Sequence, residues 1–182
     1  MNWLLFILAT GLILAIEVML RPLLGLPGRG GISPELTLVL ATWLALVARS
    51  SAVPWAMLAL GLLAELSSPG PLPGVVVGPV TLGYLAAGYV VLQLRVLVFR
   101  ESLITLIAMV FAAGLAVQLV SVALLIPHAR GWVGEAGAGW SASGQLTRGF
   151  LELLYTAAAT LPLGLILVRT IPLWHFAGKS RM

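Results

Sequence analysis

The sequence predicts an all-α membrane protein with about six transmembrane helices joined by short loops. Sixty per cent of its 182 residues are apolar, 9% are charged, and the mean hydropathy is +1.10. Soluble domains are about 45–50% apolar and about 25% charged, so this chain has too little polar surface to cover a core in water. Its apolar residues form blocks whose total length suits about six spans of about 20 residues each.

The charged residues and the missing residue types exclude several classes of protein. Cysteine is absent, so the chain can form no disulfide, thiolate or cysteine metal site. The chain has ten basic residues and six glutamates, which gives a net charge of +4. These basic residues stand singly between apolar blocks instead of forming a run or a stripe, which is typical of topology signals and not of a nucleic-acid surface. The expected surrounding is therefore the lipid bilayer, with no nucleic-acid partner.

The first predicted span covers residues 3–20, whose only ionisable residue is Glu17. It is too long for the apolar core of a signal peptide, and no basic segment precedes it. Arg21-Pro22 follows it where a signal peptide would have a small-residue cleavage site. We therefore expect this segment to be retained as a membrane helix.

The second and third apolar blocks, 32–48 and 52–66, are separated only by Arg49-Ser50-Ser51. They form either two short helices joined by a tight turn or one long tilted helix. In the long helix Arg49 would lie near the bilayer centre, where a charge costs at least about 2.5 kcal/mol. Two helices with Arg49 at the membrane surface is the less costly arrangement.

The rest of the chain divides at segments that cannot continue a helix. Residues 67–74 contain three prolines, which remove backbone donors and fix φ. The remaining predicted segments are spans at 75–94, 102–126 and 150–168, an outer loop at 127–149 and a cytoplasmic tail at 169–182. All of these segments belong to a single predicted transmembrane domain, residues 1–182.

The distribution of lysine and arginine predicts the orientation of the chain in the membrane. With six spans and the N-terminus in the cytoplasm, six basic residues lie inside and four outside. A five-span alternative, with the N-terminus outside, places seven inside and two outside but buries Arg49. Both arrangements put the C-terminus in the cytoplasm. Trp3, Trp55 and Trp174 then fall at the inner interface as an aromatic belt, whereas Trp43 falls in mid-span as a packing or lipid-facing residue.

Residues suited to catalysis are scarce within the predicted spans. The two histidines, His128 and His175, fall in the outer loop and in the tail, and the chain has no aspartate. It also lacks the short motifs of zinc proteases and serine hydrolases. We therefore expect no enzymatic activity, no metal and no cofactor.

Four glutamates fall near the outward ends of the predicted helices: Glu17, Glu35, Glu65 and Glu152. An ionisable residue within a span is by default a candidate functional group. The alternative is that glutamates near span ends reach the headgroup region and pair with Arg21 or Arg148. We favour this structural interpretation for all of them except Glu65.

Small residues cluster on two spans. Gly74 and Gly78 form a GxxxG pattern at the start of the fourth span, and Gly83, Ala87 and Gly88 follow. Small residues let helix backbones approach closely, and such packing is the main attraction between helices in lipid. The sequence leaves open whether these residues pack within the chain or against a partner. The same two alternatives apply to the last span, with Ala157, Ala158, Ala159 and Gly164.

One stretch resembles a known family. Residues 61–74, GLLAELSSPGPLPG, and residues 83–89, GYLAAGY, resemble the signature of MreD, the rod shape-determining membrane protein. In that family a helix ends in Gly-Leu-x-x-acidic, a loop of small residues follows, and the next span carries an aromatic residue and a glycine. Here Glu65 stands where the family usually has aspartate, and Pro71, Pro73 and Pro79 are additional. The candidate partner-binding or structural motif is Gly61, Glu65, Gly70, Pro71, Gly74, Gly78, Gly83, Tyr84 and Gly88.

The resemblance implies a non-enzymatic scaffold of the bacterial cell-elongation machinery, located in the bacterial inner (cytoplasmic) membrane, which supports lateral peptidoglycan synthesis and cell shape. The partner it implies is MreC, and through MreC the MreB cytoskeleton, RodA and the elongation-specific penicillin-binding protein. The implied fold is a compact six-helix bundle like the substrate-binding subunits of energy-coupling-factor vitamin transporters. That likeness supplies the alternative function, a transporter subunit that binds a vitamin-type small molecule, with Glu17, Glu35, Glu65 and Glu152 lining an outward-facing pocket.

Overall fold

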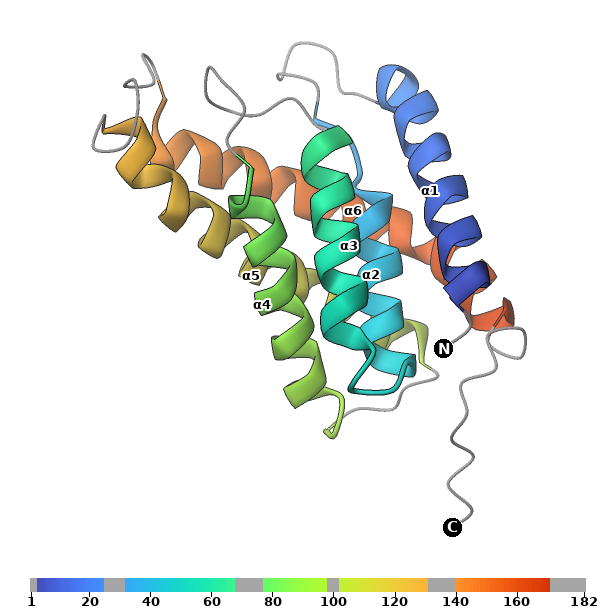
Figure 1. The fold of residues 1–182 in the computed structure, drawn as a ribbon. Coiled ribbons are helices and arrows are strands. Elements are labelled where there is room, and N and C mark those ends of the chain that lie inside the picture. Colours follow the sequence, from blue (N-terminus) through green and yellow to red (C-terminus); the bar gives the residue numbers. More distant parts are fainter. Residues whose placement is uncertain (1–2, 25–31, 68–76, 98–101, 131–139, 171–182) are drawn as a thin grey trace.

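The computed structural model describes residues 3–24, 32–67, 77–97, 102–130 and 140–170 (Figure 1). Most of the chain in these ranges is helical, which confirms the all-α prediction. The six helices of the described residues are α1 (Trp3–Leu24), α2 (Leu36–Val47), α3 (Val53–Ser67), α4 (Pro79–Leu94), α5 (Leu103–Ala129) and α6 (Ala142–Thr170).

The second and third apolar blocks are two separate helices. A turn at residues 49–52 joins α2 to α3, closed by a hydrogen bond from the Ala52 N–H to the Arg49 carbonyl at 2.9 Å. The Arg49 side chain is exposed at this turn. The alternative of one long helix with Arg49 in its middle is therefore wrong.

Three of the six helices are long and apolar enough to cross a membrane: residues 3–23 of α1, 103–127 of α5 and 142–170 of α6. The other three helices have 12, 15 and 16 residues. At about 1.5 Å per residue they measure roughly 18–24 Å, less than the roughly 30 Å of the hydrocarbon core. The described residues thus give a multi-pass membrane protein with three candidate spans.

Several helix ends differ from the predicted spans. Helix α6 begins at Ala142 instead of residue 150, and α5 continues through Pro127 to Ala129. The predicted outer loop at 127–149 is therefore partly helical. The first turns of α6 carry serine, glutamine, threonine and arginine, so hydropathy alone did not mark them. Helix α4 begins at Pro79 instead of residue 75, because Gly78 before it has φ +131°, outside the helical region.

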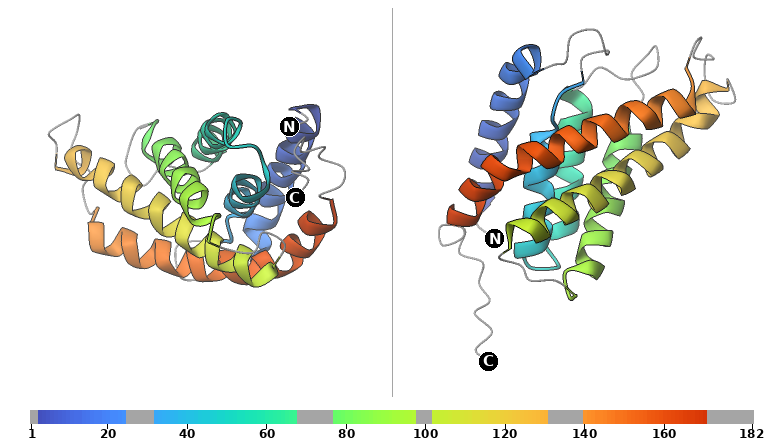
Figure 2. Two further views of the ribbon diagram at one scale, coloured as in Figure 1. Left: turned by 90° about the horizontal axis from the view of Figure 1, so that it is seen from below. Right: turned by 180° about the vertical axis from the view of Figure 1, so that it is seen from behind.

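Helix α2 lies at the centre of the fold and contacts each of the other five helices of the described part. Helices α5 and α6 lie side by side and cross the others obliquely on one side (Figures 1 and 2). Eleven of the twelve residues of α2 are buried. Because α2 is surrounded by protein and not by lipid, its ends need not reach the two surfaces of the bilayer.

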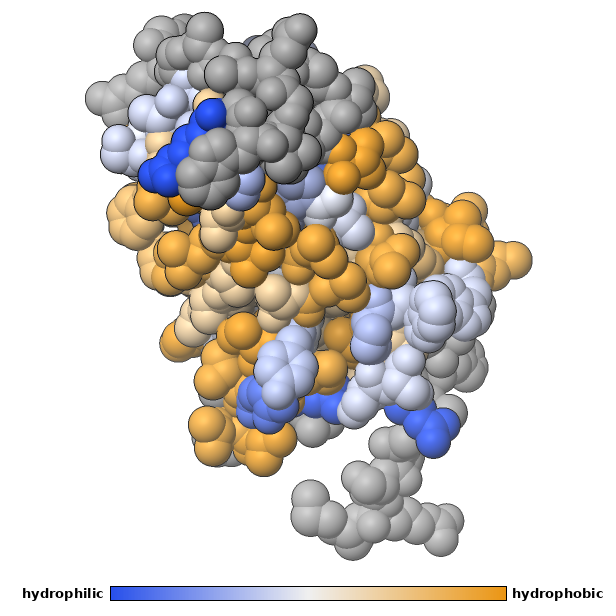
Figure 3. Space-filling view, turned by 60° about the vertical axis from the view of Figure 1, so that its left-hand side comes forward, coloured by the Kyte–Doolittle hydropathy of each residue, from blue (hydrophilic) through white to orange (hydrophobic). Residues whose placement is uncertain are grey.

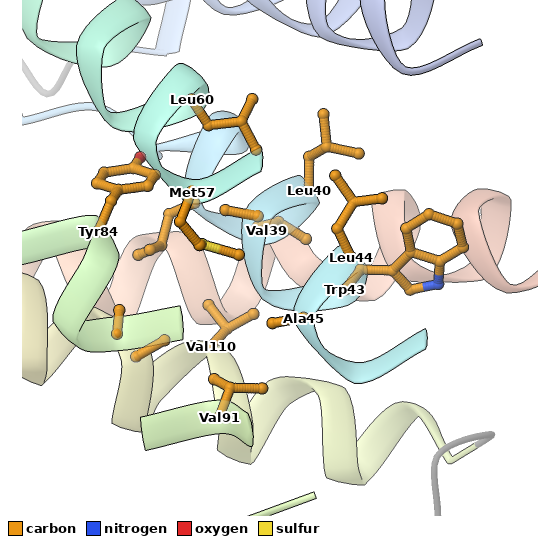
Figure 4. Close-up of a cluster of buried hydrophobic side chains, with 14 of the residues drawn as sticks. Val39, Leu40, Trp43, Leu44, Ala45, Met57, Leu60, Tyr84, Val91 and Val110 are labelled. Carbon is orange, nitrogen blue, oxygen red and sulfur yellow. The ribbon is translucent and has the colours of Figure 1, made fainter. Parts of the chain in front are cut away.

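The core forms where α2 meets α3, α4 and α5 (Figure 4). Its largest fully buried side chains include Leu40, Trp43 and Leu44 of α2, Met57 of α3 and Tyr84 of α4. Trp43 is only 2% exposed, so of the two sequence interpretations for this residue, packing is confirmed.

The outer surface is strongly apolar. Figure 3 shows a broad hydrophobic band between hydrophilic residues toward the top and bottom of the molecule. Large apolar side chains of α1 are exposed along its length, including Leu4, Ile7, Leu8, Leu12, Met19 and Leu23. An apolar surface of this extent is a liability in water and is expected in lipid, which agrees with the membrane class predicted from composition.

Candidate functional site

Three of the motif glycines lie where helices approach closely. A Cβ added at Gly61 of α3 would be 2.9 Å from Thr81 Cα of α4. One added at Gly83 would be 2.9 Å from the carbonyl oxygen of Val117 in α5. Gly88 faces the Met57 side chain of α3 in the same way. These glycines therefore pack α4 between α3 and α5 within the chain.

Of the motif residues in the loop before α4, the structure describes Gly78. Gly78 is the residue before α4, and its φ of +131° is one that side-chain-bearing residues rarely adopt. Because Gly78 precedes the helix, the prediction that it lies within the fourth span, as the second glycine of a GxxxG pattern, is wrong. Gly70, Pro71 and Gly74 lie outside the described residues.

Glu65 binds the start of α4. One of its carboxylate oxygens accepts a hydrogen bond from the Val80 N–H at 3.1 Å. The other accepts bonds from the Thr81 N–H at 3.3 Å and the Thr81 hydroxyl at 2.6 Å. The first N–H groups of a helix have no partner within it, and the positive end of the helix dipole favours an anion there. Glu65 thus caps α4 from α3; these residues are called the α4 cap below.

Glu17, which lies on α1, caps the start of α2 in the same way. One carboxylate oxygen accepts hydrogen bonds from the Thr37 N–H at 2.9 Å and the Thr37 hydroxyl at 2.7 Å. The other pairs with Arg21, one helical turn away, at 2.9 Å. Arg21 also donates to the carbonyl of Ser67, the last residue of α3, at 2.9 Å. This group, called the α2 cap below, joins three helices, and its carboxylate is only 4% exposed.

Glu35 is the residue before α2, and it forms hydrogen bonds with residues of α4 and α6. Its side chain accepts a hydrogen bond from the Tyr84 hydroxyl of α4 at 2.5 Å. Its backbone N–H donates to the Thr156 hydroxyl of α6 at 2.9 Å, and Thr156 in turn donates to the Glu152 carbonyl. Because the cap of α2 comes from Glu17, Glu35 is available to connect α2 with α4 and α6.

The predicted pairing with Arg21 or Arg148 is confirmed for two of the glutamates, although Glu17 is buried instead of reaching the surface. Glu17 pairs with Arg21, and Glu152 pairs with Arg148 at 3.0 Å on the exposed surface of α6. Glu35 and Glu65 instead accept hydrogen bonds from α4. All four carboxylates lie toward one end of the molecule, where α1 and α3 end and α2, α4 and α6 begin; we call this the glutamate end.

Sequence reasoning missed the threonine hydroxyls that bind Glu17 and Glu65, and it missed the contacts of Arg95. Thr37 and Thr81 each lie in the first turn of a helix, three residues after Pro34 and two residues after Pro79, a local signal that could have been used. Arg95, just after α4, donates to the carbonyls of Ala45 and Ala48 at 3.2 and 2.9 Å and so caps the end of α2. No local pattern marks that contact, because Arg95 lies far along the chain from both.

The space around these groups is small. The gap beside Tyr84, bounded by residues of α2 to α5 such as Leu38, Met57 and Ala87, has no room for a water molecule. A larger, almost wholly apolar groove of about 350 Å³ lies between α5 and α6, lined by residues that include Leu115, Leu119 and Phe150. The polar groups of the glutamate end are thus bonded to one another and to helix ends, an arrangement that fixes helix positions.

The described residues contain no group of three or more histidine or acidic side chains placed to hold a metal ion. Comparisons with protein-family models, with curated proteins and with solved structures found no match to this chain.

Proposed function

We propose that this protein is a non-enzymatic membrane scaffold of the MreD type, which binds an MreC-like protein and supports wall synthesis during cell elongation. The proposal starts from the resemblance of residues 61–89 to the MreD signature. It includes the finer topology of six membrane-embedded helices, with α2, α3 and α4 as short members and the C-terminus in the cytoplasm.

The observation that carries the proposal is the α4 cap. Residues that carry the resemblance, Gly61, Glu65 and Tyr84, all take part in joining α3, α4 and the start of α2. A signature whose acidic residue holds two helix ends together is what a scaffold needs, since its function is to present helix faces in a fixed arrangement. The acidic residue in this position therefore has a structural explanation that requires no substrate.

The apolar outer surface supports a partner that also lies in the membrane. Helix α1 buries one narrow stripe, Phe6, Thr10, Ile13 and Glu17, and exposes large apolar side chains on its other faces. Between helices in lipid, attraction comes from close packing and hydrogen bonds. A single-span partner could use such a face without opening the bundle.

The experiment is affinity purification of the full-length chain from a rod-shaped bacterium in mild detergent. The proposal predicts recovery of a single-span MreC-like protein in stoichiometric amount. Exchanging Glu65 for Ala should reduce that recovery, whereas Glu152→Ala, which removes an exposed ion pair, should leave it unchanged. A stoichiometric small ligand with no protein partner would overturn the proposal.

The alternative is the binding subunit of a vitamin-type transporter. One observation favours it: Glu35, Tyr84 and Thr156 converge at the glutamate end from three different elements. A ligand at micromolar concentration should then raise the melting temperature of the purified protein. No response across a panel of vitamins would exclude this alternative and leave the scaffold.

A further inference from the structure

Charge is divided between the two ends of the molecule. The described glutamates, Glu17, Glu35, Glu65 and Glu152, lie at the glutamate end, where Arg21 and Arg148 pair with two of them. The opposite end carries Arg49 in the α2–α3 turn, Arg95 just after α4 and Arg169 in the last turn of α6. We call it the arginine end; it is the lower end in Figure 1. Among the described residues it carries positive charge and no carboxylate.

The three arginines at this end differ in what they bind. Arg95 is half-buried and donates to Ala45, Ala48 and Ser50, so its position is fixed at the end of α2. Arg49 and Arg169 are exposed, and neither has a carboxylate partner in the part of the chain that the structure describes. Arg49 and Arg169 are therefore the groups able to meet an anion from outside.

Exposed apolar and aromatic side chains lie at the same end of the molecule, where α1 and α3 begin and α4 ends. Trp3 opens α1 and is 48% exposed, and Trp55 in the first turn of α3 is 66% exposed. Val96 and Leu97, which follow Arg95, are each 79% exposed. Tryptophan is enriched at membrane–water interfaces because its ring is partly apolar and partly polar. The arginine end thus has the composition of a surface lying at the headgroup level.

We propose that the arginine end binds the headgroups of anionic phospholipids through Arg49 and Arg169, with Trp3 and Trp55 seated among the adjoining acyl chains. The charge complementarity is direct: two exposed guanidinium groups can each donate two parallel hydrogen bonds to a phosphate. A zwitterionic headgroup offers a phosphate whose charge is balanced by its own ammonium group, so it binds more weakly. At the glutamate end Arg21 and Arg148 are each paired with a carboxylate, so these two arginines are less available to an anionic headgroup.

The experiment measures the melting temperature of the full-length protein in a neutral detergent while phosphatidylglycerol or phosphatidylcholine is added. Phosphatidylglycerol should raise the melting temperature more than phosphatidylcholine does, and high salt should reduce the difference. In the double variant Arg49→Gln/Arg169→Gln, binding of phosphatidylglycerol should weaken about 25-fold, about fivefold for each arginine. Exchanging both arginines for lysine should keep most of the effect.

The matched control is Arg130→Gln/Arg148→Gln, which removes two charges from the other end of α5 and α6 and should leave the lipid response intact. Equal stabilisation by the two lipids, or equal loss of response in the control variant, would overturn the proposal. Inorganic phosphate at the same concentration should give no stabilisation. If phosphate alone reproduces the response, the surface is a free-anion site and the lipid proposal is wrong.

Discussion

The α2 cap and the α4 cap each supply acceptors for backbone N–H groups at the start of a helix, which have no partner within the helix. In each, a glutamate near the end of one helix binds the backbone N–H and the hydroxyl of a threonine in the first turn of the next helix. In the sequence, Glu17 lies 20 residues before Thr37, and Glu65 lies 16 residues before Thr81. The helix pairs α1–α2 and α3–α4 are thus joined by equivalent contacts.

The two caps differ in burial and in charge balance. Glu17 is buried and has Arg21 as an ion-pair partner, and Arg21 extends the contact to α3. Glu65 is half-buried, and its described bonds go to the start of α4. This difference follows from position: α2 is enclosed by the other helices, whereas α4 keeps an exposed face. A charge in the enclosed position needs a counter-charge, while one nearer the surface is partly solvated.

The largest expected effect is that of Glu17→Ala. This change leaves the buried Thr37 N–H without its acceptor and Arg21 without its counter-charge. Removing one partner of a buried ion pair costs about 3 kcal/mol or more, so the free energy of unfolding should fall by about that amount. Denaturant unfolding of the purified protein in mixed micelles measures the change.

The control for that measurement is Glu152→Ala, which also breaks a glutamate–arginine pair with four-residue spacing. Both of its side chains are substantially exposed, and exposed pairs contribute at most about 1 kcal/mol. A loss in Glu152→Ala as large as that in Glu17→Ala would show that burial does not distinguish the two pairs.

The two caps also show which contacts the sequence could predict. The Glu17–Arg21 pair was predicted, because residues four apart on a helix are neighbours by geometry. The contacts of Glu17 with Thr37 and of Glu65 with Thr81 depend on how a loop returns the chain, and Glu35 and Tyr84 lie 49 residues apart. Composition was sufficient for the helical membrane class, but the short length of α2 becomes intelligible only once its enclosure is known.

The second prediction concerns Glu65→Ala. Loss of a helix N-cap costs about 1 kcal/mol, so the free energy of unfolding should fall by about a third as much as in Glu17→Ala. The effect should be local, because Glu65 serves one helix end. Hydrogen exchange of the Val80 and Thr81 amides should accelerate while that of the Thr37 amide stays slow. Equal acceleration at all three amides would show that the two caps are not independent.

The third prediction compares the threonines. Thr37→Val and Thr81→Val each remove one hydroxyl and keep the shape of the side chain. The loss should be about 1 kcal/mol at buried Thr37 and about 0.5 kcal/mol at half-exposed Thr81, close to the average of side-chain hydrogen bonds measured in membranes. Double-mutant cycles of Glu17 with Thr37 and of Glu65 with Thr81 isolate each pair. A larger coupling energy for Glu65 with Thr81 than for Glu17 with Thr37 would contradict the expectation that the more buried pair contributes more.

The smallest expected effect is that of Glu65→Asp, which keeps the charge and shortens the side chain by one methylene. Gly61 already brings α3 to within contact distance of Thr81, so a small rotation of α3 can return the carboxylate toward the Thr81 hydroxyl. The bond from the Val80 N–H, at 3.1 Å, is the one we expect to lengthen. Because the helix dipole still meets a negative charge, the free energy of unfolding should fall by less than about 0.5 kcal/mol. A loss equal to that of Glu65→Ala would mean that the cap depends on the reach of the carboxylate and not on its charge.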